Sequence, residues 1–230
     1  MAGGVLLLLV GVMIAAGLWF LLLRTPEEAS EPIRSVTLNT AVTVTGTDAT
    51  TDFVIFELVQ AESEVRFSLG ELLRGEPKIV VGTTDQVAAQ LAVNLSRLAD
   101  TQVGPIQINA RTLFTDNNLR NNAIRNRILF TDEFELITFV PTEIAGLPES
   151  TAVGEPVSFE ITGELTIKDV TNSETFAVTA VARTPSRLEG TAVTAITRSN
   201  YQLFVPDVTA ATNVDEEVQL EINFVAVPTP

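Results

Sequence analysis

The chain has 230 residues, with 29 acidic side chains against 14 basic ones and a formal net charge of −15. Nucleic acid is therefore not an expected partner, because binding to its phosphates needs a clustered positive field, and this chain is strongly negative overall. The chain has no cysteine and no histidine, which excludes disulfides, thiol nucleophiles, metal sites built on those residues, and imidazole as a proton carrier. Lysine occurs only at Lys78 and Lys168. We therefore expect no catalytic residues, no metal and no cofactor, and a protein that is not an enzyme.

A long apolar run stands at the N-terminus. No side chain from Met1 to Leu23 is charged, and Val5–Leu23 is almost uninterrupted apolar sequence. At ~1.5 Å per residue a helix of this length nearly covers the ~30 Å core of a bilayer, whereas a signal-peptide apolar region has only ~7–15 residues. The small residues Ala15–Gly17 lie inside the run, so cleavage after it is not expected. Residues 1–24 are predicted to form one uncleaved transmembrane helix, and a lipoprotein is excluded because lipidation needs a cysteine.

The next segment has the composition of a spacer. Residues 25–52 are rich in Thr, Glu, Ala and Pro and contain no aromatic residue, which is typical of a linker. We predict that it lifts the following domain off the membrane, although Val36–Val44 also has the composition of a strand. Residues 53–227 are predicted to form the folded domain, and residues 228–230 a short tail.

Period-two alternation of apolar and polar residues dominates residues 53–227. In Val157–Lys168, Val157, Phe159, Ile161 and Leu165 share one face, and polar side chains take the other. This pattern is typical of strands with one buried face. It predicts about ten strands: 53–59, 65–69, 78–82, 91–95, 106–110, 134–140, 157–168, 176–180, 188–198 and 218–224. No long helical pattern alternates with these strands, so an all-β antiparallel barrel or sandwich is expected.

One segment departs from the alternation. After Asp116 and Asn117, which are favourable N-cap residues, apolar residues recur at helical spacing and predict a short amphipathic helix. They are Leu119, Ala123, Ile124 and Ile128. The same segment carries Arg120, Arg125 and Arg127, a local positive cluster on an acidic chain. Such a cluster can bind a phosphate or carboxylate group, or it can be a solvated helix face paired with nearby acids.

Several short motifs follow one another in an order that resembles a known family. Ser63–Phe67 matches an opening Ser-x-Val-x-Phe strand, and Gly163–Thr171 matches a Gly-x-Leu-Thr-Ile signature. Further matches are the central stretch Arg111–Thr138 with the Ile137-Thr138-Phe139 strand, the Ile-x-Arg motif of Ile196–Tyr201, and Asp215–Val218. Together they resemble the YceI-like family of lipid-binding, lipocalin-like proteins. The sequence departs from that family where Lys168-Asp169 replaces His-Gly, and at Ala61-Glu62, where a histidine is common.

This resemblance implies an elongated antiparallel, lipocalin-like barrel with a short inserted helix, here preceded by the transmembrane helix. It also implies a binding protein for an amphiphilic lipid, such as a polyisoprenoid, a quinone-like molecule or a fatty chain, with the domain outside the cytoplasm. Arg24 taken alone would place the C-terminal side in the cytoplasm, and the family resemblance favours the periplasmic or other extracytoplasmic side. Arg120, Arg125 and Arg127 are the expected head-group residues, whereas Arg198 of the Ile-x-Arg motif is expected to pair with a carboxylate.

The expected lipid-binding positions are the inward apolar residues of the barrel. They are Phe67, Ile106, Ile108, Phe159, Ile161, Leu165, Val178, Leu220 and Ile222. An eight-stranded barrel is about the size at which the interior either fills with side chains or encloses one slender ligand. Alternation does not distinguish these outcomes. The alternative function is therefore a surface-displayed β domain with a filled barrel that acts by protein–protein interaction.

Overall fold

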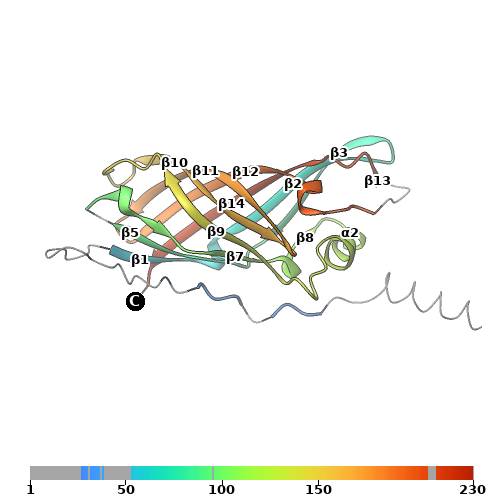
Figure 1. Ribbon diagram of the computed structural model, residues 1–230, viewed down its shortest axis with the longest axis horizontal. Helices are drawn as coiled ribbons and strands as arrows, with labels where there is room; N and C mark the ends of the chain where they lie inside the picture. Colours follow the sequence, from blue (N-terminus) through green and yellow to red (C-terminus); the bar gives the residue numbers. More distant parts are fainter. Residues whose placement is uncertain are drawn as a thin grey trace, which may run out of the picture.

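The described residues form an antiparallel sheet that curls into an elongated barrel, with one short α-helix at one end (Figure 1). The computed structural model describes residues 27–30, 32–36, 38, 53–94, 96–206 and 211–229. The strands are β1 (Phe53–Leu58), β2 (Glu64–Leu73), β3 (Glu76–Thr84), β4 (Val87–Ala88), β5 (Gln90–Asn94), β6 (Gln102–Val103), β7 (Ile106–Asn109), β8 (Phe114–Thr115), β9 (Leu136–Ala145), β10 (Pro156–Ile167), β11 (Val170–Thr184), β12 (Arg187–Thr197), β13 (Ala211–Thr212) and β14 (Glu217–Pro228). The helical elements are α2 (Asn118–Ala123), the π-helical turn η4 (Ile124–Ile128), and the 3-10 turns η1 (Gln60–Glu62), η2 (Leu98–Asp100), η3 (Ala110–Thr112) and η5 (Arg198–Tyr201).

Each of the ten predicted strands is confirmed, with boundaries that shift by a few residues. Lys168, predicted at the end of a strand, instead lies in the two-residue turn between β10 and β11. The predicted transmembrane helix of residues 1–24 lies outside the described residues, as does most of Val36–Val44. In the part of the chain that is described, no helix combines the length and apolar character needed to cross a bilayer.

The strand pairings run in a ring. From β9 the order continues through β10, β11 and β12 to β14. On its other side β14 pairs with β1 and β2, which are two parts of one strand interrupted by η1. In turn β2 pairs with β3, and β1 pairs with β5. The strands β3, β4 and β5 follow one another as parts of one long strand. Its middle part, β4, pairs with β7, and β7 pairs with β9, which closes the ring. A closed ring removes the unpaired edges that an open sheet would leave.

One seam of this ring is held by short ladders. The pairings β3–β8, β4–β7 and β5–β6 each contain two residue pairs, whereas β10 pairs with β11 along its full length of 12 residues. Backbone hydrogen bonds from Asn109 to Gln86 and from Gly104 to Gln90, both 2.9 Å, add to the seam.

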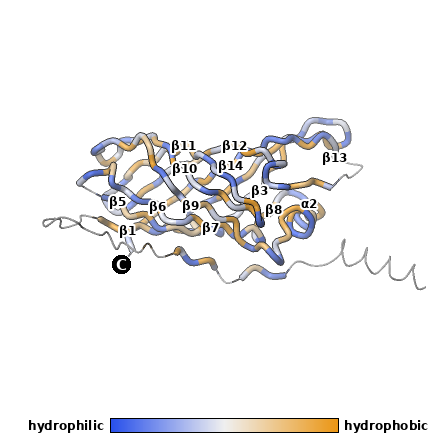
Figure 2. The backbone as a smooth tube through the Cα atoms, in the orientation of Figure 1, coloured by the Kyte–Doolittle hydropathy of each residue, from blue (hydrophilic) through white to orange (hydrophobic). Residues whose placement is uncertain are grey.

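Apolar and polar residues alternate along the strands of the barrel (Figure 2). In β10, Ile161, Leu165 and Ile167 are buried, and the alternate residues Glu160 and Glu164 are exposed. This placement removes the apolar face from water at about 25 cal/mol per Å2, which is the main stabilising contribution to such a sheet.

The helix α2 begins where the sequence predicts. The Asn117 side chain accepts hydrogen bonds from the backbone N–H groups of Leu119 (2.8 Å) and Arg120 (3.2 Å), as an N-cap residue does. The expected apolar face is only partly correct. Ile124 is buried, but Leu119 is 81% exposed, because five residues at ~100° each place the two side chains about 140° apart around a helix.

Residues 27–30, 32–36 and 38, here called the strap, lie along the outside of the barrel (Figure 1). The Ser30 hydroxyl donates to Glu135 Oε2 (2.6 Å), Gln60 Nε2 donates to the Ile33 carbonyl (2.7 Å), and the Leu38 N–H donates to Gln90 Oε1 (3.0 Å). The described part of the predicted linker is therefore in contact with the folded domain.

The C-terminus is also part of the sheet. Pro228, predicted to begin a tail, is the last residue of β14 and pairs with Phe56. The Thr229 N–H donates to the Ile55 carbonyl (2.9 Å) and continues this pairing by one residue.

Candidate functional site

All nine predicted lipid-binding positions contribute to the apolar interior of the barrel. They come from β2, β7, β10, β11 and β14, which surround the interior from different sides. Ile108, Ile161, Leu165, Val178 and Ile222 are buried. Phe67, Ile106, Phe159 and Leu220 are only partly buried, although they pack against the buried core. The alternation thus assigned each of these side chains to the correct face.

Partial burial is common among the inward apolar side chains of this barrel. Here a second set of partly buried residues surrounds the core clusters: Leu69, Val103, Ile128, Ile137, Ile144, Val170, Ala192 and Phe224. Accessible apolar surface of this kind, facing the inside of a barrel, suits the hydrocarbon chain of a ligand.

Three phenylalanine rings lie on glycines of neighbouring strands. The Phe67 ring covers Gly82 of β3, and a methyl group at Gly82 would overlap that ring. A Cβ atom at Gly190 would lie 2.5 Å from Phe224 Cζ, and one at Gly163 would lie 2.7 Å from Phe139 Cζ. A ring that occupies the space above a glycine lies along the wall of the barrel, which keeps it out of the middle of the interior.

The two ends of the barrel differ. At one end Phe56, Val93 and Ala226 form a separate buried cluster, with Leu98 of η2 packed against it. The other end is built from α2, η4, η5 and the β10–β11 turn, and is here called the helical end (Figure 1). Ile124 and Tyr201 from this end join the main core. Both ends carry apolar side chains, but only the helical end also carries the predicted arginines Arg120, Arg125 and Arg127.

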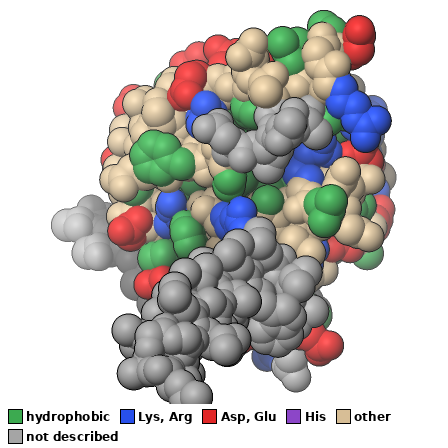
Figure 3. Space-filling view, turned by 90° about the vertical axis from the view of Figure 1, so that its right-hand side faces the viewer, with side chains coloured by type: hydrophobic (Ala, Val, Ile, Leu, Met, Phe, Trp, Pro, Cys, Tyr) green, Lys and Arg blue, Asp and Glu red, His purple; other side chains and the backbone are tan. Residues whose placement is uncertain are grey.

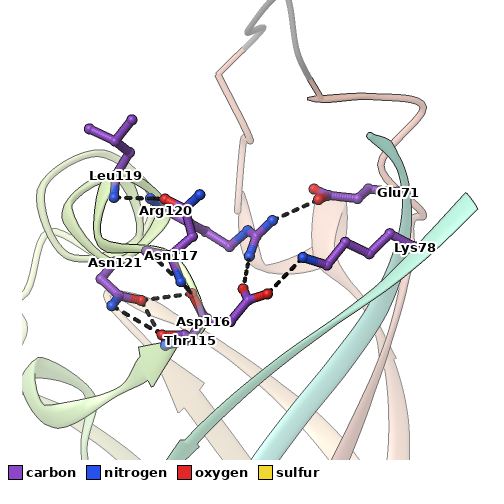
Figure 4. Close-up of polar contacts among 8 residues, drawn as sticks. All are labelled: Glu71, Lys78, Thr115, Asp116, Asn117, Leu119, Arg120 and Asn121. Atoms are coloured by element: carbon purple, nitrogen blue, oxygen red, sulfur yellow. Dashed lines mark hydrogen bonds and ion pairs between the residues drawn. The ribbon is translucent and has the colours of Figure 1, made fainter. Parts of the chain in front are cut away.

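Arg120 is held by two carboxylates (Figure 4). Its guanidinium lies 2.7 Å from Glu71 Oε1 and 2.6 Å from Asp116 Oδ1, and Lys78 Nζ lies 2.7 Å from Asp116 Oδ2. The hydrogen bond from Lys78, aided by Arg120, lowers the pKa of the Asp116 carboxyl. Glu71 is buried and comes from β2, so this network fixes α2 to the β2–β3 hairpin. Arg120 thus matches the paired-helix alternative considered for this segment.

Arg125 and Arg127 are bound differently. Arg125 Nη2 donates a long hydrogen bond of 3.4 Å to the Leu113 carbonyl, and its Nε is buried without a partner. Within the described ranges, neither Arg125 nor Arg127 forms an ion pair. These two arginines are therefore more available than Arg120 to a head group.

The family-motif positions have structural roles at the helical end. Arg198 donates to the carbonyls of Asp215 (3.0 Å) and Leu203 (3.1 Å) and forms an ion pair with Glu216 (2.6 Å), as expected for a carboxylate partner. Lys168 has a φ angle of 58° and donates to the Gln202 carbonyl (2.9 Å). The departure from His-Gly at this turn is therefore accommodated without loss of the hairpin.

Tyr201 is the last residue of the Ile196–Tyr201 motif, and the sequence predicts no separate role for it. It is fully buried, and its hydroxyl donates to Glu174 Oε1 (2.7 Å). Burial, followed by the neighbouring Glu174 carboxylate, raises the pKa of Tyr201 well above its ordinary value of 10.0. This pair connects η5 to β11 beneath the helical end.

A shallow groove of about 340 Å3 lies over β11, β12 and β14 and was not predicted from the sequence. Arg187 bridges Glu62 (2.7 Å) and Glu189 (2.8 Å), and Arg183 also contacts Glu189 (2.8 Å). Hydrogen bonds from Arg183 and Arg187 lower the pKa of Glu189. The groove is thus bordered by paired charges, which do not suit a hydrocarbon chain. No local signal reveals it, because Glu62 and Arg187 are 125 residues apart.

Solved structures with this fold come from several bacteria. BcnA of Burkholderia cenocepacia is 21% identical with a TM-score of 0.58, and the match covers 74% of this chain and 99% of that one. A polyisoprenoid binding domain from Saccharophagus degradans is 12% identical with a TM-score of 0.61, over 76% of this chain and 99% of that one. The YCEI protein of Campylobacter jejuni is 16% identical with a TM-score of 0.53, over 65% and 84%. At these identities the likeness shows the fold. Among curated proteins no match is found.

The family is shown by the sequence itself. The family model for the YceI-like domain matches residues 56–226, which run from β1 to β14 and so include nearly every strand of the barrel. The matched range also contains the nine interior positions and the arginines of the helical end. The curled antiparallel sheet, its apolar inner face and this match together establish that the chain belongs to the YceI-like family.

Proposed function

We propose that this protein is a membrane-anchored binding protein that holds an amphiphilic lipid in the interior of its barrel. The polyisoprenoid-binding relative from Saccharophagus degradans supports a long apolar chain as the ligand class. A quinone-like molecule or a fatty chain has the same kind of tail. Binding and release of such a ligand needs no bond to be made or broken, so the proposal is for a carrier and not for an enzyme.

The observation that carries the proposal is the accessible apolar inner face. Phe67, Ile106, Phe159 and Leu220 point inward, are apolar, and remain partly exposed. Each buried methylene of a ligand contributes about 0.8 kcal/mol, so a chain of several isoprene units gains enough from such a surface to bind without a dedicated polar contact.

The predicted anchor supports a location at a membrane. The apolar run Val5–Leu23 precedes the domain and is joined to it by the predicted linker, residues 25–52, and a lipid carrier attached to a bilayer stays close to its source of ligand. We place the domain on the extracytoplasmic side, in keeping with the family resemblance described above.

The direct test is native mass spectrometry of the full chain, purified gently from its producing host, with extraction and identification of what it releases. The expected result is a stoichiometric long-chain amphiphile. The variant Ile161→Asp places a carboxylate on the buried inner face of β10, and should abolish loading. The matched control Val193→Asp places the same charge at an exposed position of β12.

Two results would count against the proposal. The first is an empty protein that also fails to take up added polyprenols, quinones and fatty acids, which favours the filled barrel that acts by protein–protein interaction. The second is a folded Ile161→Asp variant that keeps its lipid.

A head-group test uses the two arginines that lack an ion pair to the described residues. Arg125→Gln together with Arg127→Gln should weaken the binding of anionic amphiphiles and leave neutral ones unchanged, because the charge-assisted hydrogen bond is lost. Arg183→Gln, at the outer groove, is the control. Equal affinities for anionic and neutral ligands before and after the change would remove the head-group role.

A further inference from the structure

The exposed apolar side chains of this protein are unevenly distributed. Across the described residues, every exposed leucine, isoleucine and phenylalanine lies at the helical end or on β3 and β8 next to it: Ile79, Phe114, Leu119, Phe130 and Phe204. The exposed large apolar residues elsewhere in those ranges are valines: Val36, Val140, Val153 and Val193. Single exposed apolar residues are ordinary on a protein surface, but large ones gathered at one end indicate an interaction surface.

Three of these side chains lie on or next to the helical elements of this end. Leu119 is 81% exposed, Phe204 is 68% exposed and Phe130 is 46% exposed. Figure 4 shows that Leu119 points away from the ion pairs that fix α2, so its exposure does not interfere with that network. Phe130 and Phe204 are linked through Lys168, whose Nζ lies 5.5 Å from the Phe130 ring centroid and bonds the carbonyl of Gln202, two residues before Phe204.

The backbone holds part of this surface in unfavourable conformations. Phe130, Lys168 and Gln202 have φ angles of 51°, 58° and 52°, in the left-handed region that costs about 1–2 kcal/mol for an L-residue. Phe130 follows η4 by two residues, and its ring is left exposed, although a buried ring would be the more stable arrangement. Such strain is found where the presentation of a side chain has a function.

Basic side chains lie among these apolar ones (Figure 3). Within the described ranges, the basic residues that form no ion pair are Arg34, Arg74, Arg125, Arg127 and Lys168. All except Arg34, which lies on the strap, belong to the helical end or to the adjacent β2–β3 turn. A protein of net charge −15 thus presents cations without carboxylate partners at the same end as its exposed aromatic side chains. Phenylalanine and leucine beside Lys and Arg are the residue types that bind the interfacial region of a bilayer.

The strap places the predicted anchor beside the same surface. The Glu27 N–H donates to Asp132 Oδ1 (3.0 Å), and Asp132 follows Phe130 by two residues. The predicted membrane helix ends at Arg24, three residues before Glu27. Extended residues span at most ~3.6 Å each, so Arg24 lies within about 11 Å of Glu27. A helix in the bilayer therefore holds the helical end, and not the opposite end, at the membrane surface.

We propose that the helical end is a membrane-docking surface, on which Leu119, Phe130 and Phe204 enter the interfacial region of the bilayer beside Arg125, Arg127 and Lys168. The inference rests on the proposed membrane anchor and deepens it, because the barrel then stands on the membrane with one defined end.

The test uses the full chain in vesicles of phosphatidylcholine and phosphatidylglycerol. Because the protein has no cysteine, Leu119→Cys and Val153→Cys each accept one environment-sensitive fluorophore. Val153 is 57% exposed and lies in the β9–β10 connection, at the opposite end of the barrel. The label at position 119 should be quenched several-fold more by nitroxide-bearing lipids than by aqueous iodide, and the label at position 153 should show the reverse.

A second pair of variants tests the apolar contacts. Phe130→Ser with Phe204→Ser should return the label at position 119 toward water, and the matched control Val140→Ser with Val193→Ser should not. Iodide quenching of both labels to the same extent would overturn the docking surface, as would a chain that fails to float with the vesicles.

Measurement of bound lipid in the same samples separates the two proposals. An empty barrel with a lipid-quenched label at position 119 supports docking and contradicts the lipid carrier. A loaded barrel with a water-exposed label at that position contradicts docking and supports the carrier.

Discussion

The glycine at position 82 offers a test of whether the interior is open. Gly82 lies in β3 opposite Phe67, and the three atoms nearest to an added methyl group all belong to the Phe67 ring. Its φ angle is not in the left-handed region, so the backbone accepts alanine. The Gly82→Ala change therefore acts on one feature, the position of that ring.

The outcome depends on what lies beyond the ring. If the interior is open, the ring turns inward and occupies the space of roughly three or four ligand methylenes. At about 0.8 kcal/mol each, the loss is about 3 kcal/mol, or about 100-fold in affinity, and the free energy of unfolding changes little. If the interior is filled, the ring has nowhere to go, and overpacking lowers the free energy of unfolding by about 1–3 kcal/mol.

Both quantities can be measured on the same protein. Native mass spectrometry of the full chain in detergent, titrated with a polyprenol, gives the affinity, and urea unfolding followed by circular dichroism gives the stability. We expect a loss of affinity with nearly unchanged stability. The double variant Gly82→Ala with Phe67→Leu removes the displaced ring and should recover most of the affinity. A large loss of stability with unchanged affinity would refute the open interior.

Three further predictions concern the polar contacts. Arg120→Ala leaves Glu71 buried without its partner and should lower the free energy of unfolding in urea by about 3 kcal/mol, whereas adding Glu71→Gln should recover part of that loss; an unchanged stability would show that the pair is not formed. Tyr201 is the only tyrosine, so phenolate absorbance in the ultraviolet reports this residue alone. Because burial and Glu174 raise the pKa of Tyr201, no phenolate should form near pH 10 until the protein unfolds. A transition at that pH in the folded protein would contradict the burial of Tyr201. Burial alone raises the pKa of Glu135, but hydrogen bonds from Ser30 and Asn109 and the charge of Arg111 outweigh it and lower the pKa below 4.5. The strap contact should therefore be stable above pH 4.5 and lost as the pH falls through the lowered value. Hydrogen exchange at the Ser30 amide would show this loss, and a loss already at neutral pH would contradict the assignment.

The sequence predicts those features of the fold that depend on local pattern. The alternation in Val157–Lys168 and in 218–224 places each side chain on the correct face, because the two-residue period of a strand is a local property. The N-cap at Asn117 is equally local. These signals are enough to predict the barrel and its nine interior positions.

The features that the sequence does not predict depend on distant partners. Leu119 has the spacing of a core residue, yet it is exposed while Ile124 is buried, because the side of α2 that is covered is decided by the elements packed against it. Arg120 and Glu71 are 49 residues apart, and Ser30 and Glu135 are 105 apart, so neither pair leaves a local signature. The division of one long strand into β3, β4 and β5 likewise depends on their pairing with β6–β8.

The position of β14 has a consequence for biosynthesis. This strand lies between β12 on one side and β1 and β2 on the other, so the ring cannot close until β14 has left the ribosome. Until then the N-terminal strands and β12 keep open edges, which are prone to pair with other chains. The proposed N-terminal membrane helix would hold the nascent domain at the bilayer during this interval.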